Sequence, residues 1–193
     1  MDVSFEVVPH FMPGLEIQDF LDEVQLHRDT IYLDSGARAV EESRLTGWQS
    51  DIGATFIYSG KEMRPQQRHA VRDRLTELTG VCYDSVLINY YHDGRCGMRF
   101  HSDPLYDRWT PNTCVVSIGE TRTFVFRETS DFSVRWQYPI SNGDVVIMHG
   151  DCQDRFQHCI KVERDDRGAA EMAPRVSLVF KQRIRDPQTG LYL

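Results

Sequence analysis

From residue 81 onward the chain consists of short β-prone runs divided by turns, and this pattern limits the fold more than any other feature. The runs are rich in Val, Ile, Phe and Tyr, which favour strands. They cover residues 83–91, 113–119, 122–128, 134–140, 143–150, 154–162 and 175–183. Many closely spaced strands after leading helices predict an α+β chain. Its core should be a β-sandwich or double-stranded β-helix (jelly roll), with the N-terminal helices on one face.

Two helices are expected ahead of these strands. Residues 14–28 carry apolar side chains at the spacing of one helical face, and residues 65–79 repeat that pattern. Pro65 suits the first turn of the second helix, and Gly80 suits its C-terminal end. The polar stretch 163–174 predicts a surface loop.

The length of 193 residues fits one domain that buries about 70% of its unfolded surface. We see no internal repeat and no linker, so residues 1–193 are expected to form a single domain, with helices in 1–80 and the jelly-roll core in 81–193. No run reaches the roughly 18 apolar residues of a membrane span. The N-terminus lacks the basic region of a signal peptide. We therefore expect a monomer without membrane contact, cytoplasmic or, in a eukaryote, nuclear.

Cysteine content and net charge bound the class of protein further. The five cysteines form no C-x-x-C pair, so free thiols are expected rather than a disulfide frame. The net charge of −7 disfavours a protein that coats nucleic acid non-specifically, because such binding depends on Lys and Arg neutralising phosphates. A local basic groove remains compatible with this charge.

His101 and Asp103 form an H-x-D pair, the first candidate for metal binding. On an extended strand these two side chains project from the same face and could reach one ion. A third ligand must come from a distant strand, and both His149 and His158 are placed to supply it. Two imidazoles and one carboxylate make the facial triad of non-haem Fe(II) oxygenases, which leaves the opposite side of the ion open. Spacing does not choose between His149 and His158.

Arg175, at the start of the C-terminal run, is the second anchor. An arginine on a jelly-roll strand can form two parallel hydrogen bonds with a carboxylate, such as the distal carboxylate of 2-oxoglutarate. Taken alone, the H-x-D pair is most often a surface turn and Arg175 a surface arginine. Their combination favours an oxygenase that depends on Fe(II) and 2-oxoglutarate.

Several motifs, taken in order, resemble the AlkB-like family of nucleic-acid demethylases. They occupy residues 44–65, 86–94, 100–103, 115–128, 143–150, 156–162 and 173–183. The resemblance implies that His158, and not His149, is the distal histidine. It implies a dioxygenase that uses Fe(II), 2-oxoglutarate and O2, with His101, Asp103 and His158 as the metal ligands and catalytic centre.

The resemblance also implies a set of residues that bind 2-oxoglutarate. Asn89 and Tyr91 match the asparagine and tyrosine that hydrogen-bond the co-substrate, and Arg175 matches the first arginine of the signature R-x-N-x-T-x-R. Ser177 and Lys181 stand at the asparagine and last arginine of that signature. Lys181 keeps the positive charge but loses the planar fork of an arginine.

A base must leave the helical stack before such an enzyme can act on it, so the resemblance implies a pocket for a flipped base. Within the segment that corresponds to the family's substrate lid, we expect Trp48 and Tyr58 to contact the substrate, although Trp48, Phe56 and Tyr58 could equally be packing aromatics. The family often carries an acidic residue two positions after the metal aspartate, where this chain has Leu105, and we expect Leu105 to contact the substrate as well. Either the substrate differs, or other groups recognise the base.

Two further groups of side chains could face a substrate. Three arginines share one side of the second helix: Arg64, Arg68 and Arg72. They form either a ridge that contacts phosphates or a solvated helix face. Three residues follow the H-x-D pair closely: Tyr106, Arg108 and Trp109. They either line the mouth of the pocket or pack on the barrel.

Together with this resemblance, the sequence predicts oxidative demethylation of N-alkylated bases in DNA or RNA. Nucleic acid is the expected partner, and formaldehyde is the expected released product. One alternative keeps the oxygenase chemistry on a protein, lipid or small molecule, and the acidic charge, Leu105 and Lys181 favour it. Another alternative is a metal-binding interaction module without turnover. The occurrence of Asn89, Tyr91 and Arg175 beside the triad argues against that module.

Overall fold

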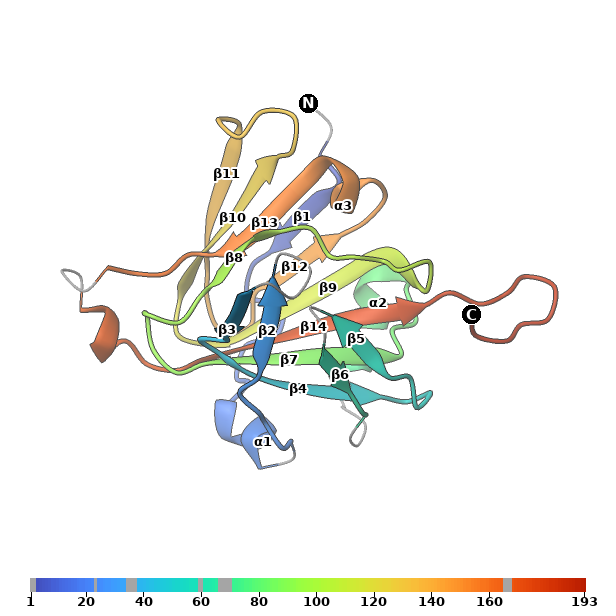
Figure 1. Cartoon of the computed structure of the whole chain (residues 1–193), viewed down its shortest axis with the longest axis horizontal. Coiled ribbons are helices and arrows are strands. Elements are labelled where there is room, and N and C mark those ends of the chain that lie inside the picture. Colours follow the sequence, from blue (N-terminus) through green and yellow to red (C-terminus); the bar gives the residue numbers. More distant parts are fainter. Residues whose placement is uncertain (1–2, 23, 34–37, 59–60, 66–70, 165–167) are drawn as a thin grey trace.

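Two antiparallel sheets form most of the computed structural model, which describes residues 3–22, 24–33, 38–58, 61–65, 71–164 and 168–193 (Figure 1). The major sheet contains, in spatial order, β1 (Phe5–Val8), β12 (Val145–Met148), β9 (Trp109–Gly119), β14 (Arg175–Arg183), β7 (Ser85–Tyr91) and β4 (Leu45–Ser50). The minor sheet contains β11 (Arg135–Ile140), β10 (Arg122–Glu128), β13 (Phe156–Ile160) and β8 (Met98–His101). This is the two-sheet core that the strand runs predict.

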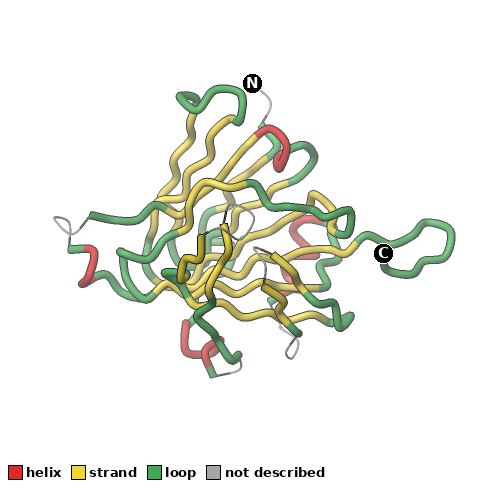
Figure 2. The backbone as a smooth tube through the Cα atoms, in the orientation of Figure 1, coloured by secondary structure: helices red, strands yellow, loops and turns green. Residues whose placement is uncertain are grey.

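Two hairpins and a few short helices complete the described chain (Figure 2). The hairpins are β2 (Thr30–Leu33) with β3 (Arg38–Glu41) and β5 (Phe56–Tyr58) with β6 (Lys61–Met63). The helices are α1 (Ile17–Leu21), α2 (Arg72–Thr79), α3 (Cys152–Arg155) and the 3-10 turn η3 (Ala169–Glu171). None of the helices in the described part of the chain is long and apolar enough to cross a membrane.

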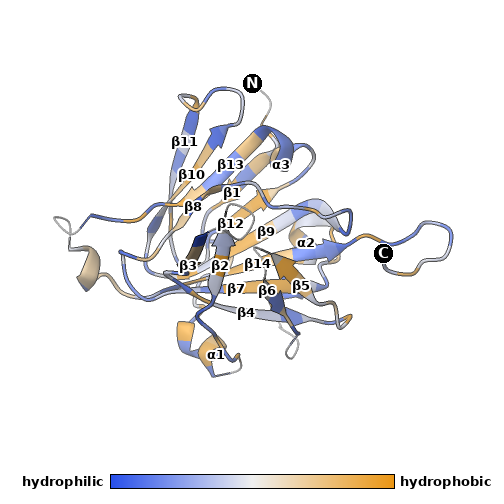
Figure 3. Ribbon diagram, in the orientation of Figure 1, coloured by the Kyte–Doolittle hydropathy of each residue, from blue (hydrophilic) through white to orange (hydrophobic). Residues whose placement is uncertain are grey.

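Hydrophobic side chains fill both faces of the major sheet. The outer cluster covers the face away from the minor sheet and includes Phe20 of α1 and Leu75 of α2. The inner cluster lies between the sheets, where Phe5 of the major sheet meets Phe126 and Phe156 of the minor sheet. In Figure 3 the hydrophobic colour accordingly gathers on the central strands of the major sheet, while β11 is mostly hydrophilic. Burial of both faces explains the continuous apolar runs in this part of the sequence.

The division at residue 81 is corrected by the strand order. β1 and β4 lie ahead of residue 81, yet β1 pairs with β12 and β4 pairs with β7, so both belong to the major sheet. Two features explain the pairing. Phe5 of β1 enters the inner cluster, and β4 covers a peptide edge of β7 that would otherwise stay unpaired. Segment 1–80 therefore contributes to the core itself.

The first helix is much shorter than residues 14–28. It ends at Leu21, and the chain then runs beside β4, where His27 and Thr46 form a bridge. Val24 and Leu26 pack over Gly47, which has no side chain to block them; a Cβ there would lie 2.7 Å from Val24 Cγ1. Contact with β4 thus overrides the helical spacing of the apolar residues.

The C-terminal end of the second helix is confirmed. Gly80 adopts a φ of 70°, and its N–H donates to the carbonyl of Thr76. The helix begins at Arg72, and residues 66–70 of the expected 65–79 lie outside the described residues. All five cysteines are free, as expected.

A third, smaller cluster corrects two expected substrate contacts. Trp48 is 0% exposed, stacks on Phe56 with ring centroids 4.5 Å apart, and donates from Nε1 to the carbonyl of Ala54. The rings of Trp109 and Trp48 make an edge-to-face contact, and Leu105 packs against this cluster. Burial therefore keeps Trp48 from contacting a substrate, and Leu105 is an anchor of its loop. The side chain of Tyr58 lies outside the described residues.

The position of Trp48 predicts a large loss of stability in Trp48→Ala. Removing a fully buried indole should lower the free energy of unfolding by about 3–5 kcal/mol, because it leaves a cavity and an unpaired carbonyl. Urea unfolding followed by circular dichroism measures the change. The control Leu191→Ala removes a side chain that is 69% exposed and should change the free energy by less than about 0.5 kcal/mol. Equal stability of both variants would show that Trp48 is not a core residue.

Candidate metal and co-substrate site

The two-residue repeat of β7 and β14 turns a row of polar side chains toward the minor sheet. On β14 the apolar residues at 176, 178 and 180 join the outer cluster, so Arg175, Ser177 and Lys181 point the other way. On β7 the residues at 86 and 88 do the same, and Asn89 and Tyr91 face inward. The register places Ser177 opposite Asn89 and Arg175 opposite Tyr91. All five expected co-substrate residues thus share one inner face.

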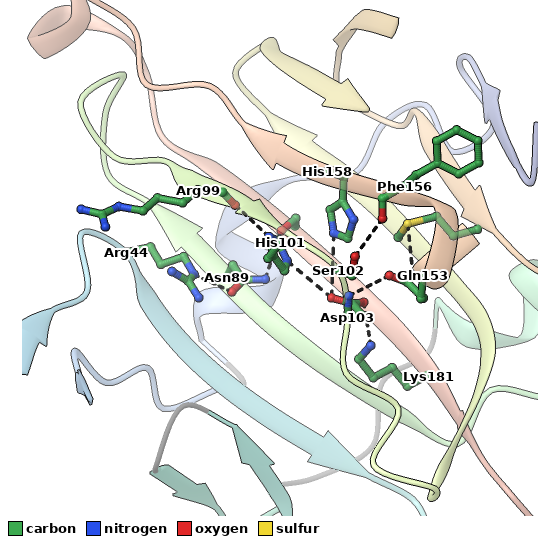
Figure 4. A network of polar contacts seen from close by, with 12 residues as sticks. Arg44, Asn89, Arg99, His101, Ser102, Asp103, Gln153, Phe156, His158 and Lys181 are labelled. Carbon is green, nitrogen blue, oxygen red and sulfur yellow. Dashed lines mark hydrogen bonds and ion pairs between the residues drawn. The ribbon is translucent and has the colours of Figure 1, made fainter. Parts of the chain in front are cut away.

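The expected metal ligands come from the opposite side, the minor sheet. His101 ends β8 and is paired with His158 of β13, and their ring centroids lie 4.3 Å apart. Asp103 Oδ1 lies 3.5 Å from His101 Nε2 and 3.8 Å from His158 Nε2 (Figure 4). One ligand atom from each residue falls within 4.8 Å of the others. The three groups therefore converge on one point, as an H-x-D…H triad requires.

A β-bulge orients His101. Between the pairs His101–His158 and Met98–Ile160, β8 has one residue more than β13. The bulge brings the carbonyl of Arg99 within 2.8 Å of His101 Nδ1. A carbonyl can only accept, so Nδ1 carries the proton and Nε2 keeps its lone pair for the triad. Bulges often re-aim a side chain in this way beside a functional site.

Asp103 is held from two directions. Its backbone N–H donates to Gln153 Oε1 over 2.7 Å, and its Oδ2 accepts from Lys181 Nζ over 2.8 Å. Oδ1 is left to face the two histidines. Burial alone would raise the pKa of this carboxyl, but Lys181 and the histidines outweigh it and hold the pKa well below its usual range. The carboxylate is therefore ionised at neutral pH, which suits a metal ligand.

His158 is kept neutral by its surroundings. It is 7% exposed, and burial followed by the nearby His101 lowers its pKa to about 3. A neutral imidazole is the form that binds a metal. The donor set of two imidazoles and one carboxylate, with the cavity on its open side, fits Fe(II).

Arg175 has the clearest need for a ligand. It is 0% exposed, its Nε donates to Ser117 Oγ over 2.9 Å, and its guanidinium carbon lies 5.2 Å from the ring centre of Tyr91. Within the described residues, neither terminal nitrogen has a hydrogen-bond partner. Burial lowers its pKa to about 10, so it remains a cation at neutral pH. A carboxylate would satisfy both nitrogens, and the residue therefore fits the distal carboxylate of 2-oxoglutarate.

A buried network that sequence reasoning missed supports Asn89. Arg44 Nε donates to Asn89 Oδ1 over 2.9 Å, and Asn89 Nδ2 donates to Ser177 Oγ over 3.3 Å. Arg44 also pairs with Glu42 at 2.9 Å. Arg44 is the first residue of the motif at 44–65, which was the available signal. Arg122 was missed as well, although it lies in the motif at 115–128.

Arg122 fixes the loop that leads into β8. Its terminal nitrogens donate to the carbonyls of Asp93, Gly94, Cys96 and Lys161. The residue is 1% exposed, so these four contacts form inside the protein. One side chain thereby ties the β7–β8 connection to the end of β13 and sets the position from which His101 projects.

A cavity of about 790 Å³ opens beside the triad. His101, Asp103 and Lys181 line its floor, and hairpin residues Ile31 and Val40 line its outer wall. Other lining residues include Arg44, Phe56 and Tyr106. His158 and Arg175 lie behind this surface, among the buried residues. The cavity is large enough for a nucleobase or a ligand of similar size.

The remaining candidates are not brought to this cavity. Arg72 pairs with Asp51, and Arg64 is exposed near Glu62 at 4.0 Å, so a phosphate ridge gains no support; Arg68 lies outside the described residues. Trp109 is 3% exposed and packs on Trp48. His149 follows β12 in the other sheet, where its N–H donates to the carbonyl of Ser4. The geometry thus agrees with His158 as third member of the triad.

Comparison with known proteins bears on the fold and the family. The 2OG-Fe(II) oxygenase superfamily matches residues 6–181. A solved structure described as "The structure of OsALKBH1" shares the fold, with a TM-score of 0.63 and 15% sequence identity, and the match covers 94% of this chain and 99% of that one. This likeness confirms the jelly-roll core.

Relatives with similar sequences point to one branch of that superfamily. The chain is 26% identical to uncharacterized protein R406 of Acanthamoeba polyphaga mimivirus over 85% of both. It is 30% identical to human alpha-ketoglutarate-dependent dioxygenase alkB homolog 3 over 77% of this chain and 54% of that protein. It is 27% identical to human DNA oxidative demethylase ALKBH2 over 68% and 53%. The chain thus spans about half the length of the two human proteins.

These matches agree with the motifs and with the convergence of the triad and the arginine anchor. The family's chemistry requires Fe(II), 2-oxoglutarate and O2, which makes its members oxidoreductases. The chain belongs to the 2OG-Fe(II) oxygenase superfamily and is an AlkB-like dioxygenase.

Proposed function

We propose that this protein removes methyl groups from N-alkylated bases in DNA or RNA, and that His101, Asp103 and His158 hold the Fe(II). The observation that carries the site assignment is the meeting of two sheets. Three metal-ligand side chains lie within 4.8 Å of one another on the minor sheet and the loop that follows β8, and a buried guanidinium on the major sheet has two terminal nitrogens without a partner among the described residues. Each half alone has ordinary explanations. Their meeting between the two sheets favours a metal with a chelating dicarboxylate.

The co-substrate would be bound by the inner face of the major sheet. Arg175 supplies two free donors for the distal carboxylate of 2-oxoglutarate, and Tyr91 lies beside it. Asn89 is oriented by Arg44 and Ser177, so its amide is preorganised before a ligand arrives. Lys181 is directed elsewhere, toward Asp103, and takes the part of a positioning residue for the metal ligand.

When bound, Fe(II) with O2 and 2-oxoglutarate supplies the oxidation of a substrate C–H bond to C–OH, with succinate and CO2 as the other products. An N-hydroxymethyl group formed in this way breaks its C–N bond, and formaldehyde leaves. The chain's own residues orient the groups and exclude water. Lys181 keeps Asp103 ionised and turned toward the histidines, while the apolar inner cluster shields the site.

Nucleic acid as the substrate class is supported by the relatives. Human ALKBH2 is named a DNA oxidative demethylase, and the match with it covers 68% of this chain. The cavity is large enough for a base, and among its lining residues is the exposed Arg99, a cation that suits a nucleotide's phosphate despite the net charge of −7.

A second candidate keeps the dioxygenase chemistry but takes a different substrate. The observation that favours it is Leu105, which stands where the family often has an acidic side chain and which packs into the Trp48 cluster. With no acidic side chain at this position, a protein, lipid or small molecule is the alternative class of substrate. Activity on methylated strands decides between the candidates.

The decisive experiment measures succinate and methyl loss together. Protein prepared without oxygen is given Fe(II), 2-oxoglutarate and O2, with or without an oligonucleotide that carries 1-methyladenine or 3-methylcytosine. We expect succinate to rise with the methylated strand, and we expect His101→Ala and Asp103→Ala to abolish both signals. The matched control His149→Ala alters an exposed histidine outside the triad and should retain wild-type activity.

Each outcome has a distinct meaning. Succinate that depends on the triad but not on the methylated strand would keep the enzyme and reject nucleic acid as its substrate. Loss of activity in His149→Ala together with normal activity in His101→Ala would contradict the assigned ligands. Removal of the metal by a chelator should stop turnover, and added Fe(II) should restore it.

Arg175 yields a separate prediction about co-substrate binding. Arg175→Met should weaken 2-oxoglutarate binding at least about tenfold, because two charge-assisted hydrogen bonds are lost. Arg175→Lys keeps the charge without the fork and should give an intermediate loss. Titration calorimetry on protein loaded with Mn(II) measures the affinity without turnover. The folded state of Arg175→Met should remain stable, because the change removes a buried charge whose two terminal nitrogens have no partner among the described residues. Unchanged affinity in a folded Arg175→Met variant would rule out this anchor.

A further inference from the structure

The loop that connects β8 with β9, which can be followed in Figure 1, contributes residues to the lining of the cavity. Tyr106 is 51% exposed and lines the same cavity as His101 and Asp103. Its side chain makes no hydrogen bond and no ring contact with any residue in the described part of the chain. Phe56, by contrast, is 4% exposed and stacked on Trp48. Tyr106 is thus an aromatic group of the cavity whose ring is not committed to packing.

The backbone of this loop holds Tyr106 in a conformation that it would rarely choose. Tyr106 and Asp107 both have a φ of 52°, in the left-handed region that disfavours bulky residues. Such strain persists only where the surroundings fix it, and it tends to occur at functional sites. Here the surroundings are clear. The N–H groups of Arg108 and Trp109 both donate to the carbonyl of Leu105 over 3.0 Å.

Leu105 and Trp109 anchor the two ends of this turn. Leu105 packs against the Trp48 cluster, and Trp109 is 3% exposed within it. The residues between them are exposed, and Tyr106, like Pro104, lines the cavity. Leu105 therefore packs into the protein, whereas Tyr106 lines the cavity. The residue placed to contact a ligand is thus Tyr106 and not its neighbour Leu105, which the sequence suggested.

We propose that Tyr106 determines substrate binding by stacking on the methylated base once that base has left its strand. This inference rests on the proposed function. A flipped base loses its neighbours in the stack, and an aromatic face at the cavity mouth replaces one of them. Adenine methylated at N1 and cytosine methylated at N3 carry a positive charge, which the face of a tyrosine ring attracts. The ring therefore favours the methylated base over its unmodified form.

The test separates the ring from the backbone that carries it. Tyr106→Asn removes the ring, while asparagine tolerates the left-handed conformation better than other residues. Tyr106→Phe keeps the ring. Tyr32→Asn is the matched control, because Tyr32 is 53% exposed but is not among the residues that line the cavity. Fluorescence anisotropy with Mn(II)-loaded protein and 2-oxoglutarate measures the Kd for a single strand carrying one 1-methyladenine, and turnover with Fe(II) gives KM and kcat.

We expect Tyr106→Asn to raise the Kd and the KM roughly 5- to 150-fold, the range that stacking of one base gives. The preference over the unmethylated strand should shrink with it. Tyr106→Phe and Tyr32→Asn should stay within about twofold of wild type, and the affinity for 2-oxoglutarate should be unchanged in all three variants.

Other results overturn the inference in recognisable ways. Wild-type binding by Tyr106→Asn, in a protein that still demethylates the strand, rejects Tyr106 and leaves the proposed function intact. An equal loss in Tyr32→Asn rejects it too, because any exposed tyrosine would then serve. A wild-type protein that neither prefers nor demethylates the methylated strand rejects the proposed function, and the role of Tyr106 falls with it.

Discussion

The two-residue alternation of β14 and β7 is the constraint on which the site depends. Because successive side chains of a strand point to opposite faces, the same nine residues of β14 can close the outer hydrophobic cluster and present Arg175, Ser177 and Lys181 to the interior. A register slip by one residue would exchange the two sets. The outer cluster prevents that slip, because the slip would move Val176, Leu178 and Phe180 to the inner face, among the polar groups of the site. Hydrophobic burial on one face thus fixes polar geometry on the other.

A single ion pair joins the two halves of the site. Lys181 belongs to the major sheet and Asp103 to the loop after the minor sheet, and their contact is 2.8 Å long. Both side chains are largely buried, so the pair adds little to net stability, because desolvation offsets the attraction. Its value is geometric. Asp103 Oδ2 is held by Lys181, and Asp103 Oδ1 is left to face the two histidines, a part that needs one positive charge and not the planar fork of an arginine. The departure from the family signature therefore has a physical reading.

The sequence was most informative where spacing alone determines geometry. His101 and Asp103 are two residues apart on an extended segment, and the positions of Asn89 and Arg175 follow from their strands. Prediction was wrong where tertiary burial decides the outcome. Trp48 lies in the segment that corresponds to the family's lid, but it is buried in the small cluster against which Leu105 packs. The helix at 14–28 is shortened by contact with Gly47, which periodicity does not reveal. Lys181 could be placed on its strand, but its partner could not.

The contacts that build the site also join residues far apart along the chain. Lys181 and Asp103 are separated by 78 positions, Arg175 and Ser117 by 58, and Asp103 and Gln153 by 50. No local segment contains the full ligand set, so no early hairpin or helix can capture the metal in its final geometry. Contacts of this separation form late and slowly, because the chain between them must first lose its freedom. Under the proposed ligand assignment, His101 and His158 would meet at one ion only once β8 has paired with β13.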